Sequence, residues 1–192
     1  AEKLYCYMIH RAEDLDRLGI MDGMCTAKEH GLTEKIGVSV YEPKEAMSAA
    51  QDDRIDAIQI PYNVLDQRLD ASSFFDVAKK TGKIIFARSA FLQGLLLMSP
   101  RAADARVKGS GRHIERFHRM AEECDCSPAE AAMHYVLSHP HIDYVVFGVD
   151  TPNQLRENIR ISKNGAASTQ CYTCLRGVFP NMPTKIIQPN LW

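Results

Sequence analysis

The sequence has no apolar run long enough to span a bilayer, and its N-terminus lacks the basic-then-apolar pattern of a secretory signal. The sequence also lacks an excess of positive or negative charge, because the formal net charge is −1 and no basic cluster occurs. These absences argue against a membrane protein and against binding to nucleic acid or to an anionic membrane surface. They favour a cytoplasmic location.

Metal-ligand patterns are scarce as well. Without an export signal, the six cysteines are expected to be reduced thiols. Cys171 and Cys174 have the spacing of half a zinc site, and Cys124 lies near Cys126, but neither pair is followed by a second well-spaced Cys/His pair. No metal site is therefore predicted. Six histidines without ligand spacing are expected on the surface or on helices: His30, His113, His118, His134, His139 and His141.

The composition is that of a globular domain of moderate size. Hydrophobic residues make up 45% and charged residues 24% of the 192 residues, which is enough for a sizeable core. No low-complexity linker interrupts the chain. We therefore expect a single domain over residues 1–192.

Short β-branched and aromatic segments alternate with helical patterns along the chain. The expected strands are residues 4–9, 36–40, 57–60, 83–87 and 144–147, and the expected helices include 14–30 with a break near 19–23, 43–50, 70–80, 127–139 and 152–165, with a long loop over 89–112. This alternation predicts right-handed βαβ units and a parallel sheet. Five strands suffice for a doubly wound sheet, whereas a parallel barrel needs about eight.

The stretch over residues 142–158 combines a strand, a glycine turn and a helix start. The run over 144–147 suits a strand that is covered on both faces, and Gly148 ends it. Thr151 can cap the next helix, with Pro152 at its first position and Gln154 completing a capping box. Such a turn presents N–H groups and the positive end of a helix dipole to a phosphate, but these residues alone favour an ordinary βα unit without a ligand role.

Polar residues stand at the C-terminal ends of all five expected strands. They are His10, Ser39, Gln59, Arg88 with Ser89, and the turn over residues 148–150. Ligands bind at this end of the strands in doubly wound sheets and in parallel barrels alike.

These strand ends resemble the aldo/keto reductases, which are NAD(P)H-dependent (β/α)8-barrel enzymes. His10 matches the position of the family's catalytic histidine, although Ala12 replaces the usual proline two residues later. Ser39 and Gln59 match the residues that hold the nicotinamide carboxamide, with Val40 in place of the family's asparagine. The resemblance therefore implies a catalytic role for His10 and cofactor binding for Ser39 and Gln59.

Two later segments extend the resemblance to the rest of the cofactor. Residues 88–95 are similar to the loop that wraps the pyrophosphate, with Arg88 where many members have an aromatic residue. Residues 148–158 are similar to the signature for the adenosine half. The implied cofactor-binding residues are Arg88, Ser89, Phe91, Gln93, Gly94, Gly148, Val149, Asp150, Gln154, Glu157 and Asn158.

The resemblance implies a partial TIM barrel, strands four to eight, in an N-terminally incomplete aldo/keto reductase-like domain. The implied reaction is reduction of a small carbonyl substrate to an alcohol by hydride transfer from NAD(P)H. The family's catalytic Asp, Tyr and Lys have no counterpart in this chain, so it is expected to be inactive or weakly active alone. The alternative is a non-catalytic nucleotide-binding or interaction subunit.

Two further expectations concern the cofactor and the partners. Asp150 corresponds to the residue that grips the 2′-phosphate of NADPH in many members, and a carboxylate there would repel a phosphate and accept hydrogen bonds from ribose hydroxyls. NADH is therefore favoured over NADPH. An incomplete barrel exposes strand edges, so a homo-oligomer or a completing partner chain is also expected.

Overall fold

The computed structural model describes residues 3–163 and 168–192, so the expected helix end at Asn164 and Gly165 lies outside the described residues. The chain forms two compact units. The first contains Ala1–Pro61, Leu69–Ala87 and His141–Tyr144, and the second contains Tyr62–Arg68, Arg88–Pro140 and Val145–Trp192. Within the described residues, no helix is both long and apolar enough to cross a membrane.

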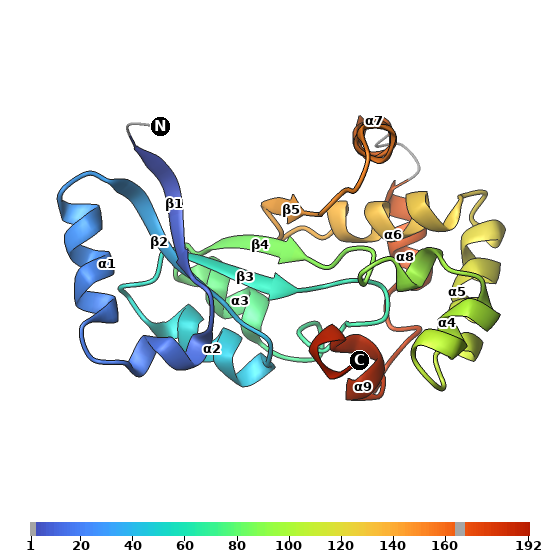
Figure 1. The fold of residues 1–192 in the computed structure, drawn as a ribbon, viewed down its shortest axis with the longest axis horizontal. Helices are drawn as coiled ribbons and strands as arrows, with labels where there is room; N and C mark the ends of the chain where they lie inside the picture. Colours follow the sequence, from blue (N-terminus) through green and yellow to red (C-terminus); the bar gives the residue numbers. More distant parts are fainter. Residues whose placement is uncertain (1–2, 164–167) are drawn as a thin grey trace. The chain divides into compact units, whose positions relative to one another are not determined.

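The strands run in sequence order across one sheet, β1-β2-β3-β4-β5 (Figure 1). Their bounds are β1 (Leu4–Ile9), β2 (Thr33–Ser39), β3 (Ala57–Pro61), β4 (Ile84–Arg88) and β5 (Tyr144–Val146). The pairs β1–β2 and β2–β3 are parallel. A doubly wound sheet reverses its strand order at a switch point, whereas a barrel sheet follows the sequence. The observed order is that of a barrel, which confirms the parallel βα prediction.

The sheet is curled. The rings of Tyr5 on β1 and Tyr144 at the start of β5 pack edge to face with their centroids 6.5 Å apart, and both residues belong to the first unit. Four strand spacings separate β1 from β5, which is about 19 Å in a flat sheet. Two tyrosine side chains bridge that span only if the sheet bends toward itself.

Aspartates anchor two strands in the first unit. The Asp56 carboxylate accepts hydrogen bonds from the Ile36 amide at 2.9 Å and from Lys28 Nζ at 2.5 Å. Burial alone would raise the pKa of Asp56, but these hydrogen bonds lower it below its ordinary value. Asp143 makes a similar contact, because its carboxylate accepts a hydrogen bond from the Ile85 amide at 2.7 Å. In each case the residue before one strand anchors the preceding strand.

Helices follow each strand. In the first unit they are η1 (Ala12–Asp16), α1 (Ile20–Glu29), α2 (Pro43–Gln51) and α3 (Phe74–Lys80). In the second unit they are η2 (Leu95–Leu97), α4 (Pro100–Arg106), α5 (Gly111–Glu123), α6 (Pro128–Leu137), α7 (Pro152–Lys163), α8 (Ser168–Leu175), α9 (Thr184–Ile187) and η4 (Pro189–Leu191). The first helical segment is broken as expected, but earlier than predicted: the break lies between the end of η1 at Asp16 and the start of α1 at Ile20, and residues 20–23 are helical.

The expectation of one loop over residues 89–112 is wrong, because α4 and η2 lie within it. The Ser99 hydroxyl accepts a hydrogen bond from the Ala102 amide at 3.3 Å, and Pro100 takes the first helical position. A serine followed by a proline is a typical helix start, so Ser99 and Pro100 could have predicted α4. The glycines on either side, Gly94 and Gly109, made the segment resemble a loop.

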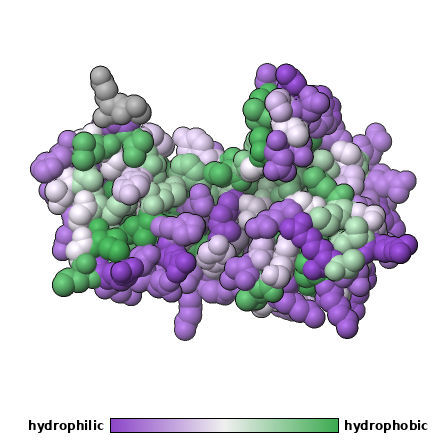
Figure 2. Space-filling view, viewed as in Figure 1, coloured by the Kyte–Doolittle hydropathy of each residue, from purple (hydrophilic) through white to green (hydrophobic). Residues whose placement is uncertain are grey.

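The expectation that β5 is covered on both faces is also wrong. Tyr144 is 46% exposed and Val146 is 42% exposed. Side chains alternate between the two faces of a strand, so Tyr144 and Val146 lie on one face, and this face is the exposed one. β5 is also the last strand in the sheet order. The first strand has the same position at the other edge, and Leu4 and Tyr5 are each about half exposed. Figure 2 shows apolar surface beside the grey N-terminal residues, where β1 lies.

A buried aromatic cluster forms the core of the second unit around Tyr62 and Tyr135, which are both fully buried. Their rings stack at 5.5 Å, and the Tyr62 hydroxyl donates to the Tyr135 hydroxyl at 3.1 Å. The imidazole of His139 packs edge-on against Tyr62 at 5.1 Å. His139 is therefore buried, contrary to the expected surface position, because its ring fills an aromatic gap at the end of α6. His134 is buried too, within α6 itself.

Candidate functional site

The predicted site residues fall into two groups, one in each compact unit. His10, Ser39 and Gln59 lie in the first unit, and we call them the strand-end group. The remaining eleven lie in the second unit, at the end of β4, in the loop after it, and in the turn and helix after β5. Each group is described by itself.

The strand-end group lies along one edge of three neighbouring strands. Ser39 and Gln59 are partners in the β2–β3 register, and the Ser39 hydroxyl donates to Gln59 Oε1 at 3.2 Å. His10 directly follows Ile9, which pairs with Val38 on β2. The three residues therefore lie at one level of the sheet, although Gln59 comes before the end of β3. Ser39 is buried, whereas His10 is exposed.

This arrangement fits a primary carboxamide. Because the carbonyl oxygen of Gln59 accepts the Ser39 hydroxyl proton, the Gln59 amide nitrogen is directed to other acceptors. The Ser39 oxygen keeps lone pairs that can accept from an N–H donor. One donor and one acceptor side by side match the oxygen and the NH2 of a carboxamide. The nicotinamide group has this pattern.

Gly37 sets the close approach of β2 and β3 beneath this pair. It pairs with Ala57, and a Cβ placed on Gly37 would overlap the Ala57 carbonyl oxygen far inside van der Waals contact. Only glycine therefore allows this register without a backbone shift. The packing of β2 against β3 thus explains why glycine occupies position 37, two residues before Ser39.

The loop after β4 winds through left-handed backbone conformations. Ser89, Leu92 and Gln93 have φ values of 65°, 48° and 50°, and Gly94 follows at 79°. The Ser89 carbonyl accepts from the Leu92 amide at 2.8 Å, and the fully buried Leu92 side chain anchors the turn in the core. Such conformations are costly for residues other than glycine, so surrounding contacts must hold them.

Three predicted residues of this loop show different surroundings. Arg88 Nη1 donates to the hydroxyl of Ser89 at 3.3 Å. The Phe91 ring packs edge-on against Phe147 at 6.5 Å, which joins this loop to the segment after β5. Gln93 is exposed, and its carbonyl accepts a hydrogen bond from Arg106.

The predicted capping box after β5 is present. Gln154 Oε1 accepts from the amides of Asp150 at 2.7 Å and Thr151 at 3.3 Å, and the Thr151 hydroxyl accepts from the Gln154 amide at 3.2 Å. The sequence suggested that N–H groups of this turn could bind a phosphate. Two of them, the amides of Asp150 and Thr151, are already hydrogen-bonded to Gln154. Gly148, Val149 and Asp150 are all exposed.

Glu157 and Asn158 on α7 were both expected to bind the cofactor, but their surroundings are different. Glu157 accepts from Arg160 at 2.7 Å, and Arg160 also reaches Glu130 on α6 at 3.1 Å. The hydrogen bond from Arg160 lowers the pKa of the Glu157 carboxyl. Asn158 is buried, with an exposed fraction of 8%. Arg160 therefore joins α7 to α6, and Glu157 pairs with Arg160 within α7, a role that residue spacing does not reveal.

Comparison with known proteins decides the family. The family model of the aldo/keto reductases matches residues 2–176, which is most of the chain. The chain belongs to the aldo/keto reductase family. Sequence similarity extends to pyridoxal 4-dehydrogenase from Microbacterium luteolum, with 25% identity over 76% of this chain.

Solved structures of this family share the fold. The aldo-keto reductase AKR11C1 from Bacillus halodurans superposes on 91% of this chain, with a TM-score of 0.73 and 18% identity in its apo form. Its holo form gives a TM-score of 0.71 with 19% identity. The chain spans 62% of the length of AKR11C1 and 44% of the length of the dehydrogenase.

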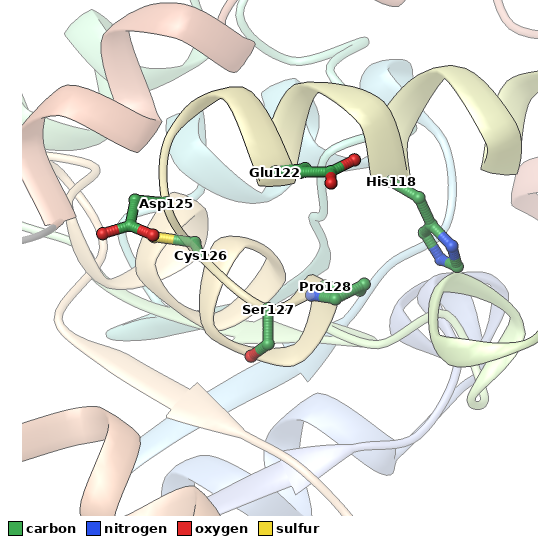
Figure 3. Close-up of a pocket in the computed structure, with 6 residues that line it drawn as sticks. All are labelled: His118, Glu122, Asp125, Cys126, Ser127 and Pro128. Atoms are coloured by element: carbon green, nitrogen blue, oxygen red, sulfur yellow. The ribbon is translucent and has the colours of Figure 1, made fainter.

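A hollow in the second unit lies away from the predicted cofactor residues of this aldo/keto reductase chain. It has a volume of about 410 Å³ at the junction of α5 and α6, and His118, Glu122 and Cys126 are among the residues that line it (Figure 3). Among the described residues, no group of three or more His, Cys, Asp or Glu side chains is arranged to hold a metal ion. The side chain of Cys171 is outside the described residues.

Proposed function

We propose that this chain provides the nicotinamide-binding strand ends and the catalytic histidine of an NAD(P)H-dependent enzyme that reduces a small carbonyl substrate. The hydrogen-bonded Ser39–Gln59 pair carries the proposal, because it offers a donor and an acceptor to a carboxamide. Membership of the aldo/keto reductase family and the likeness to the holo form of AKR11C1 support it. When bound, the reduced nicotinamide supplies the hydride.

The residues of the strand-end group have separate tasks in this proposal. Gln59 donates to the carboxamide oxygen, and Ser39 accepts from the carboxamide nitrogen. His10 donates an imidazole N–H to the substrate carbonyl oxygen and stabilises the negative charge that develops there. Proton donation is assigned to a tyrosine outside these 192 residues, so this chain alone should bind the dinucleotide with little or no turnover.

The test is a titration of the chain with NADH, followed by nicotinamide fluorescence. Replacing Gln59 with alanine should weaken binding about tenfold, since it removes a hydrogen bond and leaves a polar ligand group buried without a partner. Ser39→Ala should have a similar effect. The double variant should lose less than the sum of the two free energies, because both side chains act on one carboxamide.

Gln51→Ala is the matched control for this titration. Gln51 is exposed at the end of α2, in the same unit, and its replacement should leave NADH affinity unchanged. Equal affinity of the Gln59→Ala variant and the parent would contradict the proposed carboxamide site. Failure of the parent to bind either NADH or NADPH would overturn the proposed function as a whole.

We further propose that NADH is favoured over NADPH. Asp150 is exposed at the turn before α7, where a carboxylate repels a 2′-phosphate. The parent should bind NADH at least about fivefold more tightly than NADPH, and Asp150→Asn should narrow that ratio by improving NADPH binding. Parallel titrations with the two dinucleotides measure it. A parent that binds NADPH more tightly would contradict the assignment.

A non-catalytic interaction subunit is the second candidate. The observation that favours it is the apolar surface on the two sheet-edge strands, where Tyr5, Tyr7 and Tyr144 are each about half exposed. The chain should then self-associate, or bind a completing chain, through these strands. Sedimentation of the chain at micromolar concentration tests this. A monodisperse monomer that reduces aldehydes would argue against an interaction role.

A further inference from the structure

Arg106 lies outside every predicted motif but contacts the candidate pyrophosphate loop. It is the last residue of α4, and its Nη1 donates to the Gln93 carbonyl oxygen at 3.2 Å. Gln93 is one of the loop residues with left-handed backbone, with Leu92 before it and Gly94 after it. A hydrogen bond to the carbonyl of such a residue opposes its return to a more favourable conformation.

The guanidinium of Arg106 is itself held by the C-terminal residue. Its central carbon lies 5.1 Å from the centre of the Trp192 ring, within the range of a cation–π contact. The Trp192 indole N–H donates to the Lys185 carbonyl oxygen at 2.9 Å. Trp192 is thus fixed to α9, and Arg106 lies between it and the loop.

A second contact holds the other end of the same loop. His118 on α5 donates from Nε2 to the Leu96 carbonyl oxygen at 2.8 Å. The segment over residues 89–97 is therefore supported from α4 and from α5. The Arg106 support continues to Trp192 through the cation–π contact.

We propose that Arg106 is a positioning residue that couples the C-terminal Trp192 to the dinucleotide-binding loop. The inference rests on the proposed cofactor function of that loop. Trp192 orients the planar guanidinium, the guanidinium holds the Gln93 carbonyl, and the carbonyl fixes the left-handed turn. The C-terminal segment thereby sets the affinity for the pyrophosphate of the cofactor.

A competing explanation treats Arg106 as a plain positive charge that attracts the phosphates. The two explanations predict different results for Arg106→Lys, which keeps the charge but lacks the planar fork that stacks on indole. They also differ for Trp192→Leu, which leaves the charge in place and removes the stacking. Positioning requires both residues, whereas simple attraction requires only the charge.

The test combines NADH titration with amide hydrogen exchange of residues 89–97. Arg106→Lys and Trp192→Leu should each weaken NADH binding about fivefold, and the double variant should be no weaker than either single variant. Exchange in the loop should be faster in both single variants, with exchange in the first unit unchanged. Arg101→Lys is the control, because Arg101 is an exposed residue of the same helix.

Three results would overturn the coupling. Parent-like NADH affinity in Arg106→Lys would indicate a charge effect alone. Additive losses in the double variant would indicate two independent contacts. Unchanged exchange over residues 89–97 in both single variants would refute it even if the parent binds no dinucleotide, and this result separates the coupling from the proposed function.

Discussion

Replacing Gly37 with alanine is expected to destabilise the protein by about 3 kcal/mol. The added Cβ would overlap the carbonyl oxygen of Ala57, the register partner of Gly37 on the adjacent strand. The overlapping atom belongs to the backbone, so no side-chain rotation relieves it. The two strands must move apart, which lengthens their hydrogen bonds near Ser39 and Gln59. Urea unfolding followed by far-ultraviolet circular dichroism measures the loss.

Gly23→Ala is the matched control, with an effect of opposite sign. Gly23 lies within α1, and a Cβ at this position meets no atom within 4 Å. Alanine there should stabilise the protein by about 0.5–1 kcal/mol, because glycine is a poor helix former. A Gly37→Ala variant as stable as the parent would show that β2 and β3 tolerate separation, contrary to the packing described above.

Replacing Tyr62 with alanine is expected to cost about 4 kcal/mol, because it leaves a large cavity in the core of the second unit. The Tyr62 ring is fully buried and contacts both Tyr135 and His139. Trp192, the chain's single tryptophan, lies in the same unit and reports its unfolding by fluorescence.

Tyr62→Phe separates packing from hydrogen bonding at this position. It keeps the ring and removes the hydroxyl that donates to Tyr135, so it should cost about 1 kcal/mol. An alanine variant no less stable than the phenylalanine variant would mean that the ring contributes little. These contacts assign Tyr62 to the core of the second unit.

The sequence by itself predicted the βα repeat, the positions of all five strands and the capping box at Thr151 and Gln154. These features depend on local patterns, namely apolar spacing, glycine turns and capping residues, which act within a few residues along the chain. It also predicted that Ser39 and Gln59 belong together, through resemblance to the aldo/keto reductases. Their hydrogen bond and shared register agree with that pairing.

Only the tertiary structure decided which of the predicted residues are already hydrogen-bonded or buried within the protein. Glu157 bonds to Arg160, the Asp150 and Thr151 amides bond to Gln154, and His139 is buried against Tyr62. Exposure of one face of β5 likewise depends on which elements pack against that face, and the composition of the strand does not encode it. The support of Gln93 by Arg106 joins residues thirteen positions apart. Contacts of this kind depend on how elements pack, and local sequence patterns carry no record of that packing.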